Sequence, residues 1–511
     1  MPGMPGGSGP SKAVPGAGYA LALLLAINLF NYIDRQVLSA VLPILQLDAA
    51  LFDPTDPWLS TKLGLLTSAF LVTYTIFSPV FGWFGDRGSR WALVGVAVVV
   101  WSLASGGSGL ATGYLVLLLT RCLVGIGEAA YGPVAPSMLS DMYPVADRGK
   151  VMSWFYLAIP VGSALGFVVG GIVAAAFGWR SAFYVVVVPG LILGALCFLM
   201  RDPRVHHAPA DKTEGPTPES PGYLAVVREL SGVRSFVLCC AGMTCTTFML
   251  GGVAAWAPTY IFQREARFAL TPEAITKLEE LKTTEGNRVV PADVTDRLRP
   301  AVGETEYDYP AFKALLLDAL GQELLRQYGE RVYEAAPTAD SATLGGVNFR
   351  FGVIVVLSGL GATLLGGWLG DKFRAMGVRG AYFQVAGWGT VAAWPFFVLM
   401  LYIPFPYAWF PLFAAVFGLF VNTGPANTIL ANVTRSEIRA TAFAVNILII
   451  HLLGDVISPP LIGLAADVSS LNTAFLVTSL MILAGGLLWV AGARHLDADT
   501  TRADGELLKK S

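Results

Sequence analysis

Long runs of apolar residues recur along almost the whole chain, separated by short polar turns. A bilayer core requires about 20 apolar residues in helical form. Membrane-spanning β-strands would instead alternate apolar and polar residues over about 10 positions, and these runs are continuous. The pattern therefore predicts an all-α integral membrane protein with 12 transmembrane helices in two six-helix halves. The predicted helices lie near residues 18–46, 61–84, 91–111, 113–140, 150–177, 181–200, 235–262, 347–370, 380–403, 406–432, 438–466 and 471–493.

Polar stretches divide the apolar pattern into domains. Residues 263–346 interrupt the second half with charged segments of helical period, which predict one or two surface helices forming a solvated cap. A lid is the alternative interpretation of this insertion. The predicted organisation is a disordered cytoplasmic leader at 1–17, a six-helix bundle at 18–200, a cytoplasmic linker at 201–234, a second bundle at 235–493 containing the insertion, and a cytoplasmic tail at 494–511.

The distribution of Lys and Arg predicts the orientation. Most of these residues fall in loops on the side of the two termini, whereas only Lys62 and Arg180 lie in the short loops on the opposite side. Cations accumulate in short cytoplasmic loops. We therefore expect both termini in the cytoplasm, with the protein in a plasma membrane of the bacterial inner-membrane type.

Composition supports a membrane protein and excludes other classes. Hydrophobic residues make up 54% of the 511 residues and charged residues only 14%, with a mean hydropathy of +0.60; soluble proteins average about 25% charged residues. The net charge of −2 and the lack of a basic tract argue against a nucleic-acid partner. The five cysteines all lie in apolar runs without metal-ligand spacing, and we expect no cofactor and no metal.

A short motif recurs at matching places in the two halves. "GWFGDRGSR" (82–90) follows the second predicted helix, and "GWLGDKFRAMG" (367–377) follows the eighth. The repeat predicts close helix approach at Gly82 and Gly85, because small residues let backbones pack in lipid. It also predicts a set of salt bridges that closes the cytoplasmic side. The candidate cytoplasmic gate residues are Gly82, Asp86, Arg87, Arg90, Arg148, Asp371, Lys372 and Arg439.

Ionisable residues also lie at membrane depth in the first half. Asp34 and Arg35 lie near the middle of the first predicted helix, and Arg121 and Glu128 lie two turns apart on the fourth, roughly 10 Å by helix rise. Buried charges in a membrane are costly and mark substrate or ion pathways by default. Structural ion pairing is the alternative. The candidate substrate and proton-coupling residues of this half are Asn31, Tyr32, Asp34, Arg35, Arg121 and Glu128.

The second half offers fewer polar candidates. His451 and Asp455 lie four residues apart on the eleventh predicted helix, and Asn422 lies on the tenth. Histidine titrates near neutral pH, so His451 is a candidate for substrate contact. Asn422 is a second candidate, whereas Asp455 precedes "ISPP", a predicted helix break, and can be structural.

Several of these stretches resemble known transporter sequences. The repeated Gly-Trp-x-Gly-Asp-cation motif resembles the signature of the major facilitator superfamily. "NYIDRQVLS" (31–39), "VGIGEAAYGPVAPSMLSDMYP" (124–144) and "SWFYLAIPVGSALGFVVGG" (153–171) resemble the spinster family within it. The match covers the first five predicted helices; the second half matches only in its general pattern, and the 263–346 insertion departs from the family.

The resemblance implies a secondary active transporter of an amphipathic lipid, such as a lysophospholipid or a sphingosine-1-phosphate-like molecule. We expect alternating access with proton coupling, in which an arginine (Arg121 or Arg35) binds the headgroup. Glu128 is the first candidate for the proton site and Asp34 the second, so that a proton on Glu128 frees Arg121. The expected partners are the lipid substrate, protons and the bilayer, with the protein a monomer and not an enzyme. A proton-coupled symporter of a small organic anion is the alternative, and a lipid scramblase or sensor is a more distant one.

Overall fold

The computed structural model describes residues 13–200, 223–282, 287–435 and 438–508. Within these ranges the chain is helical, and 12 helices are long and apolar enough to cross a membrane. The predicted all-α fold with 12 spans is therefore confirmed. The leader lies largely outside the described residues, since only its last positions from 13 onward are described.

The first half runs from residue 17 to residue 197 and carries six of the spans, the fourth and sixth each divided at a short joint. Its helices are α1 (Ala17–Leu45), α2 (Leu59–Arg87), α3 (Arg90–Gly109), α4 (Tyr114–Ala129), α5 (Tyr131–Met142), α6 (Val145–Phe177), α7 (Trp179–Tyr184) and α8 (Val187–Cys197).

The second half repeats this plan. The eleventh of the 12 spans contains a π-helical segment shortly before Pro459 and Pro460. Its helices are α10 (Arg234–Glu265), α14 (Leu344–Ala375), α15 (Ala381–Tyr402), α16 (Trp409–Phe420), α17 (Thr423–Asn432), α18 (Arg439–Ile450), η3 (His451–Asp455), α19 (Ser458–Val468), α20 (Leu471–Thr478) and α21 (Leu480–Gly492).

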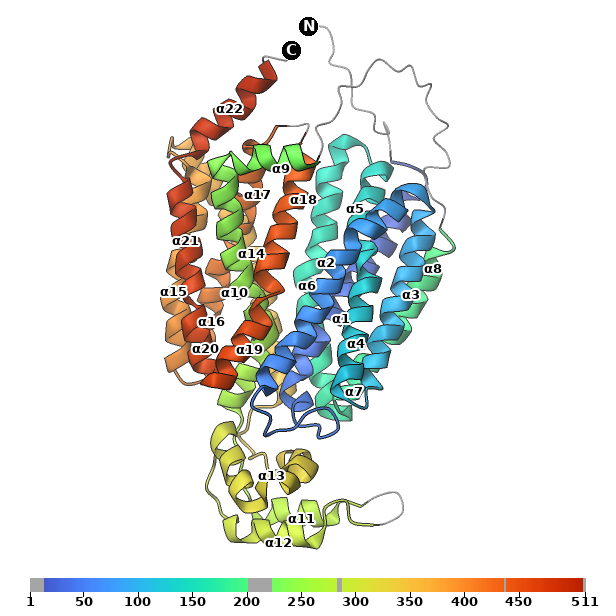
Figure 1. Cartoon of the computed structure of the whole chain (residues 1–511), viewed down its shortest axis with the longest axis vertical. Helices are drawn as coiled ribbons and strands as arrows, with labels where there is room; N and C mark the ends of the chain where they lie inside the picture. The colour runs from blue at the N-terminus through green and yellow to red at the C-terminus, as the bar shows by residue number, and fades with distance from the viewer. Residues whose placement is uncertain (1–12, 201–222, 283–286, 436–437, 509–511) are drawn as a thin grey trace.

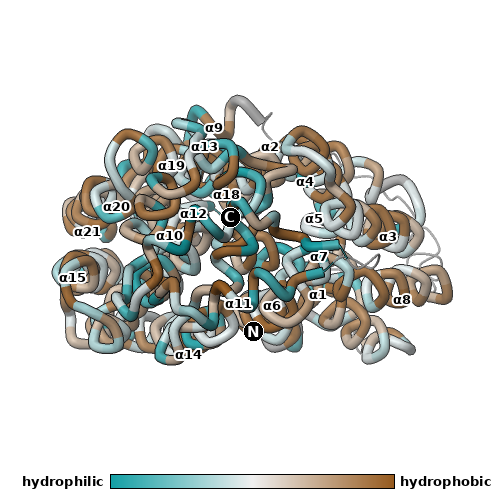
Figure 2. Tube along the Cα trace, turned by 90° about the horizontal axis from the view of Figure 1, so that it is seen from below, coloured by the Kyte–Doolittle hydropathy of each residue, from teal (hydrophilic) through white to brown (hydrophobic). Residues whose placement is uncertain are grey.

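The two halves stand side by side with the termini at one end and the insertion at the other (Figure 1). We call these ends the terminal side and the cap side. Seen from the cap side, hydrophobic positions prevail along outer helices such as α3, α8 and α21, as expected for helices that face lipid (Figure 2). Figure 1 shows α19 and α2 converging near the cap side, while the helices of the two halves diverge towards the terminal side.

The contact between the halves, which we call the seam, is tightest near the cap side. There, Asp467 of α19 accepts hydrogen bonds from the backbone N–H groups of Ser60 and Thr61 at the start of α2, both at 2.8 Å. The Asn348 amide of α14 donates to the Ala40 carbonyl of α1 at 3.1 Å. Glycines make this approach possible, because a Cβ at Gly64 would lie 2.4 Å from the Pro459 carbonyl oxygen.

The insertion is a folded body with its own apolar core, and residues 266–343 are here called the cap. It contains α11 (Pro272–Glu280), α12 (Ala292–Leu298), η2 (Arg299–Ala301) and α13 (Tyr309–Ala335). Phe268 stacks on Phe312 at the centre of this core, with ring centroids 5.0 Å apart. The cap contains three α-helices where one or two were expected, because α12 was not recognised, and all three pack through apolar faces into one core.

The linker and the tail also contain helices. Residues 201–222 of the linker lie outside the described residues, and α9 (Tyr223–Ser231) follows them on the terminal side. Glu229 of α9 forms a bidentate pair with Arg435, with nitrogen–oxygen distances of 2.6–2.9 Å. The tail forms α22 (Leu496–Leu508), and Asp499 accepts a hydrogen bond from the backbone of Ser235 at 2.9 Å.

Candidate functional site

Two of the predicted charged residues form a direct ion pair in the middle of the first half. Arg35 Nε donates to Glu128 Oε2 at 2.7 Å, which joins α1 to the end of α4. The Glu128 side chain is fully buried, whereas the Arg35 side chain is 16% exposed. A charged pair at this depth is stable only because each partner compensates the lost hydration of the other.

Aromatic rings surround the Arg35 guanidinium. Its carbon lies 4.8 Å from the Tyr32 ring centroid, 5.0 Å from that of Phe70 and 4.9 Å from that of Tyr74. Ring faces attract a guanidinium by about 0.5–2 kcal/mol each, depending on exposure. The two Nη groups of Arg35 have no hydrogen-bond partner among the described residues. The cage therefore holds the cation in place while its outer nitrogens stay free to bind an anion.

The other two predicted charges, Asp34 and Arg121, interact electrostatically, and each bonds a different serine of α3. The Asp34 carboxylate accepts a hydrogen bond from the Ser105 hydroxyl, and Arg121 Nη2 donates to Ser108 Oγ at 2.7 Å. Arg121 also lies over the Phe183 ring, 5.2 Å from its centroid. Both charged side chains are buried, and among the described residues no ion pair joins them.

This geometry corrects the pairing that helix spacing suggested. Arg121 and Glu128 share a helix, yet Glu128 pairs with Arg35 of another helix and Arg121 bonds a serine. A residue on a neighbouring helix can approach directly, whereas two turns along one helix separate side chains by roughly 10 Å. A proton on Glu128 would therefore release Arg35 rather than Arg121.

Two glycines bring Glu128 to this position. A Cβ at Gly125 would lie 2.2 Å from the Phe70 carbonyl oxygen, and one at Gly127 would lie 2.8 Å from the Trp101 backbone nitrogen. Helix α4 is thus wedged between α2 and α3 with no room for a side chain on these faces. In the "GIGE" stretch, the two glycines allow close helix packing, and this packing positions the Glu128 carboxylate in the bundle interior.

Unsatisfied polar atoms remain around the ion pair. Asp34 Oδ2 is buried without a hydrogen-bond partner in the described protein. The Asn31 side chain interacts with the Glu128 carboxylate, although neither Glu128 Oε1 nor the Asn31 amide nitrogen makes a hydrogen bond of good geometry. A buried polar atom without a partner costs about 1–3 kcal/mol. Incomplete bonding at these predicted site residues leaves room for a proton, a water molecule or a ligand group to complete it.

The polar candidates of the second half lie apart from this cluster. His451 Nδ1 lies 2.9 Å from Asp455 Oδ2 within η3, and the His451 side chain is 31% exposed. Next to this segment, the Ser68 hydroxyl of α2 bonds the Val456 carbonyl across the seam. The Asn422 amide instead bonds the Leu419 carbonyl of its own span at 2.6 Å, so the structure shows a local role for it.

In both copies of the repeated motif, the second glycine makes a tighter helix contact than the first. A Cβ at Gly85 would lie 2.7 Å from a Val134 methyl group, and one at Gly370 would lie 2.5 Å from the Tyr382 ring. At Gly82 the nearest atom is 3.8 Å away, and at Gly367 nothing lies within 4 Å. The approach is tightest at the second glycine of each motif, whereas Gly82 makes an ordinary contact with Pro133 of α5 and the backbone of Gly367 lies against Gly424 of α17.

The described gate charges bond within their own half. Arg90 Nη1 binds Asp141 at 2.6 Å, Asp371 accepts from the Tyr382 hydroxyl at 2.8 Å, and Arg439 donates to the Thr434 carbonyl at 3.3 Å. The Lys372 ammonium lies 4.7 Å from the Trp368 ring centroid. The side chains of Asp86, Arg87 and Arg148 lie outside the described part of the structure, so the predicted latch stays a prediction.

Sequence analysis missed the residues that surround the charges. Phe70 and Tyr74 of α2 form two walls of the cage, and Ser105 and Ser108 of α3 hold Asp34 and Arg121. The only signal was spacing, since each pair sits three or four residues apart on one helix face. Aromatic and hydroxyl residues are so common in membrane helices that this spacing could not single them out.

Comparisons with known proteins agree with this architecture. Residues 24–275 match the Major Facilitator Superfamily. Protein spinster homolog 3 of Danio rerio is 30% identical over 464 residues, covering 89% of this chain and 78% of that protein. Protein spinster homolog 1 of Homo sapiens is 29% identical over 507 residues, covering 94% and 82%.

Solved structures show the same fold. A bacterial homologue of the human lysosomal transporter Spinster, in an inward-facing and occupied conformation, superposes with a TM-score of 0.68 at 17% identity, covering 95% of this chain and 99% of that one. A D-xylose–proton symporter superposes with a TM-score of 0.59 at 16% identity, covering 92% and 96%. With the sequence match, the 12 spans and the repeated motif, the chain belongs to the spinster family of major facilitator superfamily transporters.

Proposed function

We propose that this protein is a proton-coupled carrier of an amphipathic lipid with an anionic headgroup, such as a lysophospholipid or a sphingosine-1-phosphate-like molecule. The observation that carries the proposal is the caged Arg35 beside Glu128, with its Nη groups free of protein partners. A guanidinium in this state suits a phosphate, which it can bind through two parallel hydrogen bonds.

Proton coupling would follow from competition for Arg35. An ionised Glu128 neutralises the guanidinium and holds its Nε. A protonated Glu128 would leave a net positive charge at the same place, which favours an anionic headgroup. Proton and headgroup would thus bind together, and departure of the proton would restore the ion pair and expel the headgroup.

The conformation described here fits the inward-facing stage of such a cycle. Hydrogen bonds across the seam lie near the cap side, and the helices diverge towards the terminal side (Figure 1). We place the protein in a bacterial inner membrane. The cation distribution supports an orientation in which both termini are in the cytoplasm. Labelling of an introduced terminal cysteine by an impermeant reagent in intact cells would contradict this orientation.

Glu128→Gln tests the proton site directly. In proteoliposomes with an imposed pH gradient, uptake of a fluorescent lysophospholipid should respond to the gradient in the wild type and lose that response in the variant. Glutamine keeps the shape of the side chain but carries no titratable proton. Glu279→Gln, on the cap surface, is the matched control and should behave as wild type. Gradient-dependent uptake by Glu128→Gln would refute the proposed proton site.

The same assay separates the alternative substrate class. Glycerol 3-phosphate offers the anionic headgroup without an acyl chain, so it should compete weakly if the chain contributes to binding. Competition as strong as that of the full lysolipid would instead support a symporter of small organic anions. Lipid flux that responds neither to the pH gradient nor to any other imposed ion gradient would indicate a scramblase.

A further inference from the structure

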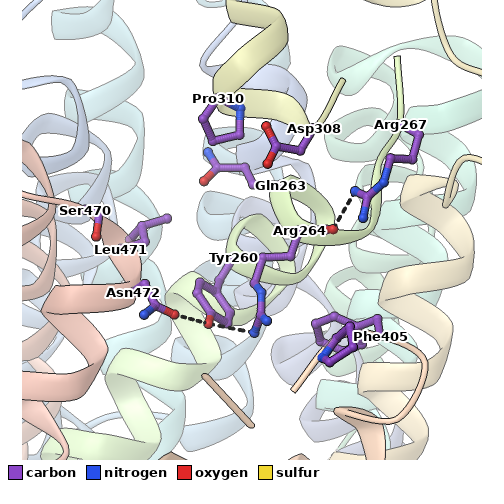
Figure 3. A pocket seen from close by; sticks show the side chains of 11 residues that line it. Tyr260, Gln263, Arg264, Arg267, Asp308, Pro310, Phe405, Ser470, Leu471 and Asn472 are labelled. Atoms are coloured by element: carbon purple, nitrogen blue, oxygen red, sulfur yellow. Dashed lines mark hydrogen bonds between the residues drawn. The ribbon is translucent and has the colours of Figure 1, made fainter. Parts of the chain in front are cut away.

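The cap leaves the second half at the end of α10 and returns to it at the start of α14. Arg264, at the end of α10, donates to the carbonyls of Met400 at 2.8 Å and Ile403 at 3.0 Å. Figure 3 shows the same guanidinium bonded to the Tyr260 hydroxyl, which in turn bonds Asn472, beside Phe405. These bonds anchor the end of α10, from which the cap emerges, to α15 and α20. The cap begins and ends in helices of the second half, so it follows that half.

The cap also crosses the seam and contacts the first half. Leu47, just after α1, packs against the apolar core of the cap. Arg326 of α13 lies 3.9 Å from Asp53 in the loop between α1 and α2. Lys313 of α13 interacts electrostatically with both Asp53 and Asp467, and Asp467 is the residue that caps α2 across the seam.

Glu330 is the charged group at the centre of this docking face. It faces Asp48, after α1, and Arg180 of α7 in the first half, together with Arg331 and Glu334 of its own helix. Asp48 is already paired with Arg180 at 2.6 Å, and Glu334 with Arg331 at 2.8 Å. No ion pair of Glu330 itself is present among the described residues. Its carboxylate therefore lies near two other carboxylates, those of Asp48 and Glu334, each of which is already paired with its own arginine.

The docking face is incompletely packed. A cavity of about 420 Å³ separates the cap from the ends of α1 and α6, with Ala174 and Trp179 on one side and Tyr333 and Glu330 on the other. This cavity opens to the surface and is not a sealed void in a packed interior. This contact combines open space with a carboxylate that has no cation of its own in the described part of the chain, and such a contact can be released when the cap separates from the first half.

We propose that the cap is a strap that holds the cap side of the transporter closed, and that protonation of Glu330 sets how firmly it docks on the first half. Opening this side requires the halves to part at the seam. The cap follows the second half, so its contacts at Asp53, Asp48 and Leu47 must break in that step.

The sign of the pH dependence follows from the surroundings of Glu330. Burial, followed by repulsion from Asp48 and Glu334, raises the pKa of Glu330 from 4.5 to about 7, against the opposing effect of Arg331 and Arg180. A docked state with a raised pKa binds the proton more tightly than the undocked state. Its extra stability is present below the ordinary pKa and is lost as pH rises through about 7. Between pH 5.5 and 8.5 docking should weaken by roughly 30-fold.

Cross-linking across the docking face tests the strap. Asp53→Cys with Arg326→Cys, in a background with Cys122→Ala, would be treated with a short bismaleimide in detergent without substrate. Cross-linking during a short exposure to the reagent should be efficient at pH 5.5 and should fall at pH 8.5. The yield at each pH is corrected for the pH dependence of the maleimide reaction itself. Glu279→Cys with Arg299→Cys, which lies wholly within the cap, supplies that calibration.

Glu330→Gln gives the decisive variant, because glutamine imitates the protonated acid at every pH. Its cross-linking should stay high at pH 8.5, while Glu323→Gln, an exposed residue of the same helix, should follow the wild type. The double-cysteine protein that keeps the native Glu330, once cross-linked at 53–326, should also lose transport. Cross-linking that ignores pH, or transport that survives the cross-link, would overturn the proposal. The cross-linking readout needs no substrate, so it stands or falls separately from the proposed lipid transport.

Discussion

At the scale of single residues, the environment of each charge decides its role. Arg35 and Arg121 have the same side chain at similar depth, yet one pairs with a carboxylate inside an aromatic cage and the other bonds a serine. Arg35 keeps 16% of its side chain exposed, whereas Arg121 as a residue is only 2% exposed. Arg35 is therefore the better candidate for contact with a substrate, and Arg121 the better candidate for a structural partner of Asp34.

Arg35→Lys separates charge from geometry. Lysine keeps the positive charge but loses the planar fork and much of the stacking on Tyr32 and Tyr74. A loss of about 1–2 kcal/mol should raise the KM for the anionic lipid by roughly 5- to 30-fold. Initial uptake rates across a range of lipid concentrations measure this change. Arg299→Lys on the cap should leave KM unchanged, and an unaltered KM in Arg35→Lys would show that the cage does not bind the headgroup.

At the scale of the elements, close glycine contacts set the distances between helices. Gly125 and Gly127 let α4 approach the backbones of α2 and α3, and that approach delivers Glu128 to Arg35. The repeated motif follows the same rule, since a Cβ at Gly85 or Gly370 would overlap a neighbouring helix, whereas one at Gly82 or Gly367 would not. Helix α4 therefore acts as a rigid carrier of the proton-site candidate.

Gly125→Val should destabilise the first half. Its Cβ would lie 2.2 Å from the Phe70 carbonyl oxygen, and backbone cannot yield as a flexible side chain can. Overpacking of this kind costs about 1–3 kcal/mol, which should lower the Tm of the purified protein by several degrees. Gly367→Ala, where nothing lies within 4 Å, is the control and should hold or raise the Tm. An unchanged Tm in Gly125→Val would mean that α4 does not require this close approach.

At the scale of the whole molecule, the seam determines which side is open. Helix α2 begins after Trp58, whose side chain cannot cap it, and Asp467 from the other half bonds its first free N–H groups instead. A carboxylate at a helix N-terminus is favoured by the helix dipole as well as by these bonds. Closure of this side of the protein is thus partly due to a carboxylate of one half that caps the N-terminus of a helix in the other half.

Asp467→Asn should favour opening of the cap side. Hydrogen bonds to a charged group contribute about 1.5–3 kcal/mol, so their weakening should shift the balance of conformations by about 10-fold. Spin labels at Lys62 and Ser469 would report the shift as a longer distance population across the seam. Asp296→Asn, on the cap surface, provides the comparison. A distance distribution identical to that of the wild type would show that Asp467 does not hold the seam.

The sequence alone determined the class of the molecule, because helix length, hydropathy and repeats are local properties of the chain. It also located the buried charges, since Asp34, Arg35, Arg121 and Glu128 stand out against apolar neighbours. Only the tertiary structure decided that Glu128 pairs with Arg35, that Tyr74 closes the cage, and that the cap crosses the seam. Those contacts join residues far apart in the chain, and their partners are fixed by helix packing, which no periodicity within a single helix encodes.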